Sequence, residues 1–225
     1  MVKSVRITTI SLLIVGFCMS AAIAAESPWK KIGEKNGIVG FTRATSRSSI
    51  DEMKAIGIVE APVAAVEALI RDIPAETEWM YKCSEAAVIN TPEFKSAGDT
   101  IYVYNVTDMP MPVSDRDAVA KALYTIDKAT GTIYIHVANV QTTYLLDKKK
   151  VRMPLVDVYY TLVPKGPDKT EVTYTALADP GGNLPAFVVN MLTKNLSIET
   201  IAGIRTMVKK DKYKNAKAVV TTTPH

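Results

Sequence analysis

The segment DPGGNLPAFVVNM, residues 179–191, determines how the rest of the chain must be arranged. Gly181 and Gly182 can adopt positive φ and turn the chain sharply, and Pro185 suits the first turn of a helix. Apolar side chains then recur at helical spacing to about residue 210, which predicts a long C-terminal helix with one apolar side. The apolar positions are Leu184, Phe187, Val188, Met191, Leu192, Leu196, Ile201, Ile204 and Val208.

Before this helix the apolar pattern has a period of two, which indicates β-strands. Short turns connect most of the segments, so we expect antiparallel pairing. We also expect two short helices, at residues 62–72 and 73–81. The predicted fold is α+β, a curved antiparallel sheet of about eight strands whose concave face the long C-terminal helix covers. The predicted strands are residues 36–47, 52–61, 83–91, 100–108, 117–127, 132–141, 155–166 and 170–179.

Residues 1–25 have the pattern of a secretory signal peptide. Lys3 and Arg6 form a positive n-region, an apolar stretch of about ten residues follows, and Ala22 and Ala24 form an A-x-A cleavage site. We expect cleavage near Ala24 or Ala25 and secretion across the inner membrane, into a bacterial periplasm; the alternative is an uncleaved N-terminal anchor. One domain then spans residues 26–212, and residues 213–225 are predicted to be a basic disordered tail.

Composition argues against several classes of function. Removal of Lys3 and Arg6 leaves 25 basic against 23 acidic residues, a net charge of +2 that does not indicate nucleic-acid binding. Cleavage also removes Cys18, so Cys83 has no partner for an internal disulfide; it is either a small buried hydrophobe or a reactive thiol. The chain contains no zinc-ligand spacing, nucleophile elbow or P-loop motif.

Three segments resemble motifs of START lipid-transfer domains. These are PMPVSDRDAV (110–119), DPGGNLPAFVVN (179–190) and, more weakly, VRMP (151–154), in matching order and spacing. The resemblance is nearest to the phosphatidylcholine-transfer branch, here in an exported form. It implies a helix-grip fold with a lipid-sized tunnel between sheet and helix, and no metal, redox cofactor or catalysis.

Strand 117–127 carries the main evidence for a cavity. Ala118, Ala120, Ala122 and Tyr124 share one face, and charged residues on the other face make the alanine face the inward one. A row of alanines leaves volume unfilled, which favours a ligand cavity. The alternative is that large side chains of the C-terminal helix, such as Phe187, Met191 and Leu192, fill that volume.

Other ligand-binding candidates are less specific. Methionines adapt to flexible apolar ligands but also fill gaps in cores, and tyrosines provide an apolar body with a polar tip but suit any half-buried strand. On this basis and by the resemblance, we assign to the ligand site Tyr102, Tyr104, Met109, Met111, Tyr134, His136, Met153, Leu184, Phe187, Val188, Met191 and Leu192. Gly181 and Gly182 are assigned as a hinge.

Two basic features have two interpretations each. Arg116 matches the arginine of the family's Arg–Asp motif; it either binds a phosphate or another polar headgroup, or forms a structural ion pair. The run DKKKVR, residues 147–152, is either a solvated turn or a site of transient contact with an anionic membrane.

The predicted function is non-catalytic binding and transfer of a single lipid, of the phospholipid, sterol or hopanoid class, by a monomer. The alternative is a cyclase or hydrolase of the same fold, acting on a lipid or polyketide, with His136 and Tyr134 as an acid–base pair.

Overall fold

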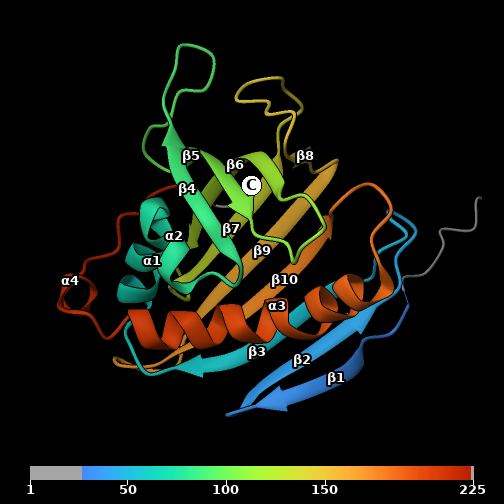
Figure 1. The fold of residues 1–225 in the computed structure, drawn as a ribbon. Helices are drawn as coiled ribbons and strands as arrows, with labels where there is room; N and C mark the ends of the chain where they lie inside the picture. The colour runs from blue at the N-terminus through green and yellow to red at the C-terminus, as the bar shows by residue number, and fades with distance from the viewer. Residues whose placement is uncertain (1–26, 224–225) are drawn as a thin grey trace, which may run out of the picture.

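The computed structural model describes residues 27–223, except for the side chains of residues 186, 187, 190, 193 and 194. The predicted signal peptide therefore lies outside the described residues, as does the Phe187 side chain. Figure 1 shows one strongly curved sheet with a long helix, α3, across its concave face. This arrangement is the predicted helix-grip fold.

The sheet has the order β1-β2-β3-β10-β9-β7-β6-β5-β4 and is not closed, because β1 and β4 are its free edges. All neighbours in this order pair antiparallel, and the two-residue β8 pairs parallel with β6. The strands are β1 (Lys30–Lys35), β2 (Ile38–Arg43), β3 (Glu52–Val59), β4 (Cys83–Ile89), β5 (Thr100–Thr107), β6 (Arg116–Asp127), β7 (Thr132–Asn139), β8 (Val151–Arg152), β9 (Leu155–Pro164) and β10 (Thr170–Asp179).

All eight predicted strands are present, as β2–β7, β9 and β10. The pattern missed β1 because its sequence KKIGEK is charged and mostly exposed at the sheet edge, and β8 because two residues carry no periodicity. The helices are α1 (Val63–Arg71), the 3₁₀ turn η1 (Ile73–Ala75), α2 (Glu76–Trp79), α3 (Ala186–Met207) and α4 (Asp211–Lys214). The helix predictions before β4 and after β10 are confirmed, whereas α4 was not expected.

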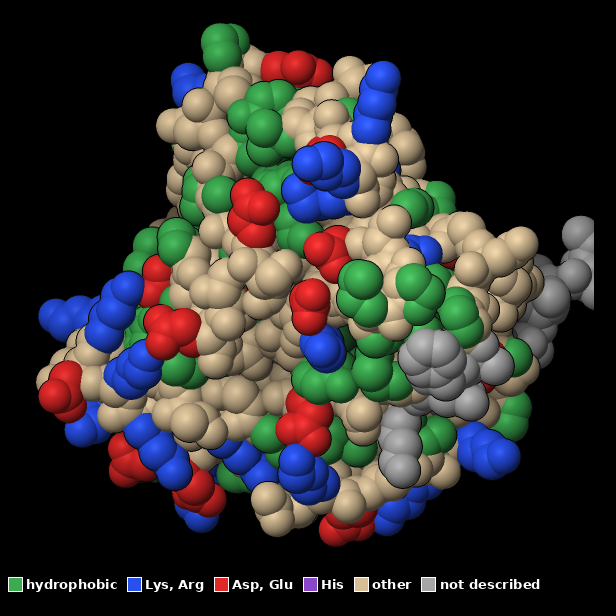
Figure 2. Space-filling model, in the orientation of Figure 1, with side chains coloured by type: hydrophobic (Ala, Val, Ile, Leu, Met, Phe, Trp, Pro, Cys, Tyr) green, Lys and Arg blue, Asp and Glu red, His purple; other side chains and the backbone are tan. Residues whose placement is uncertain are grey.

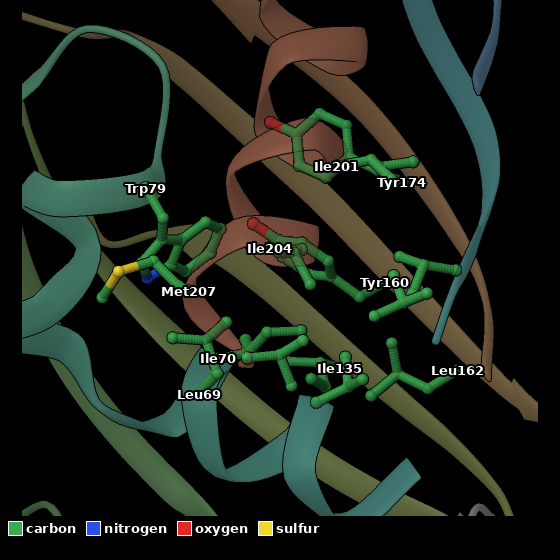
Figure 3. Close-up of a cluster of buried hydrophobic side chains, with 14 of the residues drawn as sticks. Leu69, Ile70, Trp79, Ile135, Tyr160, Leu162, Tyr174, Ile201, Ile204 and Met207 are labelled. Carbon is green, nitrogen blue, oxygen red and sulfur yellow. The ribbon is translucent and has the colours of Figure 1, made fainter. Parts of the chain in front are cut away.

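The C-terminal half of α3 fills the concave face of the sheet. Ile201 and Ile204 are fully buried, and Figure 3 shows them beside Tyr174 and Tyr160 of the sheet, with Trp79 of α2 on the other side of the helix. Apolar side chains of α1 complete this cluster. The core therefore lies between α1, α2, the sheet and this half of α3.

Gly203 allows α3 to approach α2 this closely. A Cβ atom at this position would lie 2.0 Å from the Trp79 carbonyl oxygen, a backbone atom that cannot rotate away. The helix contact is therefore one that only glycine permits.

The convex face of β5 and β6 carries a second apolar cluster. Val119, Tyr104 and Phe94 are buried there, with Tyr102 and Tyr144 packed against them. Apolar side chains therefore cover the face opposite the alanines around Val119, whereas Lys121 and Leu123 on the same face are exposed.

The C-terminal segment is ordered against the domain, which corrects the prediction of a disordered tail from residue 213. Tyr213 and Val220 are buried. The Glu67 carboxylate accepts backbone hydrogen bonds from residues 219 and 220 at 2.9 and 3.0 Å, and Asp99 accepts bonds from Thr221 and Thr222. The basic composition concealed these contacts because their acceptors lie more than 120 residues away.

No helix within residues 27–223 is both long and apolar enough to cross a membrane.

Replacing Gly203 with alanine should lower the free energy of unfolding by at least about 2 kcal/mol, because the added methyl group forces α3 away from α2. The matched control is Gly33→Ala, whose Cβ would meet only the end of Ile198, at 3.9 Å. Chemical denaturation of both variants measures the difference, and equal midpoints would show that the α2–α3 contact is not tight.

Candidate functional site

A row of large side chains crosses the concave face of the sheet. Tyr124 of β6 pairs with Ile135, Ile135 with Tyr160, and Tyr160 with Tyr174 of β10, so the four side chains lie in register on neighbouring strands. All four are buried, and the rings of Tyr160 and Tyr174 meet edge to face with centroids 5.0 Å apart. We call this set the tyrosine row.

Smaller side chains replace the large ones nearer the other end of these strands. The next row is Ala122, Val137, Val158 and Ala176, and Ala120 and Ala118 follow on β6. These small residues leave a space that the C-terminal half of α3 does not reach. The space is bounded by the tyrosine row on one side and by loops on the other.

This space is a cavity beneath the N-terminal half of α3. Leu184, Val189, Leu192 and Leu196 form its cover, and Ile50, Met109, Met153 and Pro180 come from loops at the end of the sheet where β6, β8 and β9 begin and β5 and β10 end. In Figure 2, hydrophobic side chains gather around this half of α3, whereas charged side chains dominate the opposite edge of the same face.

The cavity is narrow. Its volume is about 120 Å³, and the atom-free space reaches about 1230 Å³ only when its opening toward solvent is counted. A cavity of ~150 Å³ holds a single benzene molecule. A larger guest therefore needs the cover to move outward.

One ionisable residue stands out in the cavity wall. Glu76, the first residue of α2, is 6% exposed. Burial raises the pKa of its carboxyl from 4.5 to about 8, and a hydrogen bond from Asn105 opposes this only in part. Oε2 of Glu76 has no hydrogen-bond partner among the described residues. With a pKa of about 8, the Glu76 carboxyl is mostly protonated at pH 7.

The other titratable groups of the wall are also uncharged. Burial raises the pKa of the Cys83 thiol to about 12, with a smaller contribution from Glu76, which is ionised at that pH. Burial likewise raises the pKa values of Tyr124, Tyr160 and Tyr174. Cys83 is half-buried and its thiol is protonated at neutral pH, which argues against the interpretation as a reactive thiol. None of the described residues that line the cavity is Lys, Arg or His.

Eight of the residues predicted for the ligand site line this cavity. Two come from loops, four from β6, and two from the cover. They are Met109, Met153, Ala118, Ala120, Ala122, Tyr124, Leu184 and Leu192.

Eight further candidates are not among the described residues that line this cavity. Tyr102 and Tyr104 belong to the cluster on the convex face, and Met111 is 90% exposed in the loop before β6. Val188 is fully buried and Met191 half-buried, and neither is among the residues that line the cavity. Tyr134, His136 and Arg116 are also outside it.

His136 and Tyr134 lie on the sheet surface away from α3. The His136 ring stacks on Tyr159 with centroids 4.2 Å apart, and its Nε2 is 2.7 Å from Asp157 Oδ1. Arg47 also pairs with Asp157. Strand alternation did not reveal the direction of either side chain, because β7 has half-buried residues on both faces.

Arg116 is buried and holds the turn that leads into α3. Its guanidinium donates to the carbonyl oxygens of Pro180 and Gly181, both at 3.0 Å, and to that of Ser114. The guanidinium thus binds backbone carbonyls, which differs from both predicted roles, the headgroup contact and the ion pair. The ion pair belongs to Arg152, which donates two hydrogen bonds to Asp117 at 3.0 and 2.9 Å.

Sequence reasoning missed Glu76, Asn105, Tyr160 and Tyr174 as cavity residues. Glu76 has the signature of a first-turn acid on a surface helix. Only its position under α3 shows that it is buried. The tyrosines of β9 and β10 were overlooked because single tyrosines are common in half-buried strands.

The structure also bears on metal binding. The described part of the chain contains no group of three or more His, Cys, Asp or Glu side chains placed to hold a metal ion.

The Glu76 carboxyl should make stability depend on pH. The unfolded chain releases this proton near pH 4.5 and the folded chain only near pH 8, so the unfolding free energy should fall between these values, by up to about 1.4 kcal/mol per pH unit. Glu76→Gln should remove this pH dependence. Its free energy of unfolding should exceed that of wild type by the largest margin at pH 8. Chemical denaturation at several pH values measures the unfolding free energy, and Glu78→Gln, at an exposed position, is the control. If the unfolding free energies of wild type and Glu76→Gln change with pH in parallel, the prediction is wrong.

The comparisons with known proteins agree with this architecture. The START domain family model matches residues 19–214. The chain is 28% identical to an uncharacterised protein of Pseudomonas aeruginosa. The alignment covers 91% of this chain and 97% of that protein.

Two solved structures share the fold. The STAR-related lipid transfer protein of Xanthomonas axonopodis has a TM-score of 0.72 and 27% identity, over 81% of this chain and 99% of that one. Human StAR-related lipid transfer protein 5 has a TM-score of 0.71 and 20% identity, over 80% of this chain and 86% of that one. With the family model covering most of its length, the chain belongs to the START domain family.

Proposed function

We propose that this protein binds one lipid in the cavity beneath α3 and transfers it unchanged between membranes outside the cytoplasm. The observation that carries the proposal is the cavity itself, a space lined by alanine, valine, leucine and methionine side chains and closed by one half of a helix. Membership of the START family and similarity to a lipid transfer protein support it.

Apolar burial provides the driving force. Each Å² of lipid surface that passes from water into the cavity contributes roughly 25 cal/mol, which offsets extraction of the lipid from its bilayer. Small side chains such as Ala118 and Ala120 provide room for the guest, while the methionines from the loops adapt to its shape.

The cover must move to admit a lipid, because the closed cavity is smaller than an acyl chain requires. The C-terminal half of α3 is fixed by its contact with α2 at Gly203, so we place the motion in the N-terminal half. Gly181 and Gly182 have φ of +65° and +66° and form the hinge. Arg116 holds this turn in the closed position.

Catalysis in the cavity has less support. The acid–base pair considered for a cyclase or hydrolase, His136 and Tyr134, lies outside the cavity wall. Glu76 remains the one carboxylic acid among the described lining residues, and a binding role for it is proposed below.

The location and the membrane contact are also part of the proposal. The signal-peptide pattern of residues 1–25 supports export to the periplasm. Exposed Leu145 and Leu146 precede exposed Lys148 and Lys149, a combination that suits transient contact with an anionic bilayer. Lys150 and Arg152 of the same basic run are paired with Asp147 and Asp117 instead.

Mass spectrometry of organic extracts tests the function directly. The mature protein, isolated from its native compartment without detergent, is expected to carry one lipid per chain. Folded protein that carries none, and takes up none from donor vesicles, would overturn the proposal.

Ala120→Phe should fill the cavity and reduce bound lipid at least tenfold, because the ring occupies the space of the guest. The control is Leu123→Phe on the same strand, where the side chain is 36% exposed on the other face. Lipid content measured on both folded variants checks this; equal lipid content would place the guest elsewhere.

Gly182→Ala should slow lipid exchange several-fold, because alanine restricts the backbone rotation that the hinge requires. An added Cβ would meet only the end of Arg116, at 3.8 Å. The matched control is Gly98→Ala, also at positive φ and with no atom within 4 Å of the added Cβ. Both variants should lose about 1 kcal/mol of stability; equal exchange rates in vesicle transfer assays would exclude the hinge.

A further inference from the structure

Glu76 and its neighbours form a polar site inside an otherwise apolar cavity. The carboxyl group is buried, lines the cavity, and has one oxygen without a hydrogen-bond partner among the described residues. A buried polar group without a hydrogen-bond partner lowers the stability of the fold, and this cost applies to Oε2 of Glu76. A ligand group that hydrogen-bonds to Glu76 would remove it.

Asn105 interacts with the Glu76 carboxyl at the cavity wall. Its side chain hydrogen-bonds to Glu76 from β5, the strand that runs beside the alanines of β6. Oε2 of the same carboxyl still has no hydrogen-bond partner among the described residues. Tyr160 and Tyr174 line the same cavity and are buried.

The charge of the wall limits the chemistry of that partner. An anionic phosphate or carboxylate in the cavity would find no cation among the described lining residues. The arginine near the turn, Arg116, already donates to three carbonyl oxygens. Burying an unpaired charge is far more costly than burying a hydrogen-bonded neutral group, so an anionic headgroup must remain outside.

A protonated carboxyl is both a donor and an acceptor of hydrogen bonds. A hydroxyl group has the same two capacities and carries no charge. We therefore propose that Glu76, positioned by Asn105, binds an uncharged hydroxyl group of the lipid inside the cavity, and so selects lipid alcohols over lipids whose buried end is charged. This inference rests on the proposed lipid-binding function.

Three probes with the same ten-carbon chain test this selection: decan-1-ol, decylamine and decyl phosphate. Each competes with the neutral dye N-phenyl-1-naphthylamine for delipidated protein at pH 6.5, where amine and phosphate are charged. For wild type, half-displacement by decan-1-ol should need at least tenfold less probe than either charged compound. The dye signal alone reports whether the cavity accepts apolar guests.

Two substitutions separate binding from structure. Glu76→Gln keeps a donor and an acceptor without charge and should retain the preference for decan-1-ol within about threefold. Glu76→Leu should still bind the dye but require about tenfold more decan-1-ol. The matched control is Glu78→Leu in the same helix, where the exposed carboxylate pairs with Lys210 and the preference should not change.

Several results would overturn the inference. If decylamine is the best competitor and Glu76→Gln abolishes its binding, Glu76 is an anionic site for an ammonium group. If folded Glu76→Leu keeps the wild-type preference, Glu76 has only a structural role. Dye binding without any preference among the three probes would overturn this inference alone, whereas failure of folded wild type to bind dye or any probe would overturn the proposed lipid binding as well.

Discussion

The close packing of α3 against α2 and the sheet is the constraint on which the rest of the structure depends. Gly203 brings the helix to the Trp79 carbonyl, and Ile201 and Ile204 bury against Tyr174 and Tyr160. This contact fixes one half of a 22-residue helix. The other half extends over strands with small side chains, and the cavity exists because that half has less to pack against.

Side-chain size along the strands divides the concave face in two. The tyrosine row supports the fixed half of α3, and the alanines and valines beyond it leave a space open. A domain of this kind needs a close-packed core for stability and unfilled volume for a guest. Here the two lie side by side beneath one helix, so a change in the cavity need not disturb the core.

The cavity wall and its rim also differ in charge. The ionisable groups that face the cavity are kept neutral by burial, whereas cations such as Arg116 and Arg152 bind to carbonyl groups and to Asp117 around its rim. A neutral wall suits an apolar guest. Oε2 of Glu76, which has no hydrogen-bond partner among the described residues, is a polar point in that wall. The contact of Arg116 with the turn at Gly181 connects the rim of the cavity to the segment that leads into the N-terminal half of α3.

The sequence by itself determined the strand pattern, the sharp turn before the C-terminal helix and the inward alanine face, because local periodicity and glycine conformation follow from neighbouring residues. Tertiary structure alone decided the burial of Glu76, the binding of residues 219–222 by Glu67 and Asp99, and the positions of Tyr104 and His136 outside the cavity. Each of these depends on contacts between residues far apart in the chain, and no local pattern encodes which face of a strand a distant loop or helix will cover.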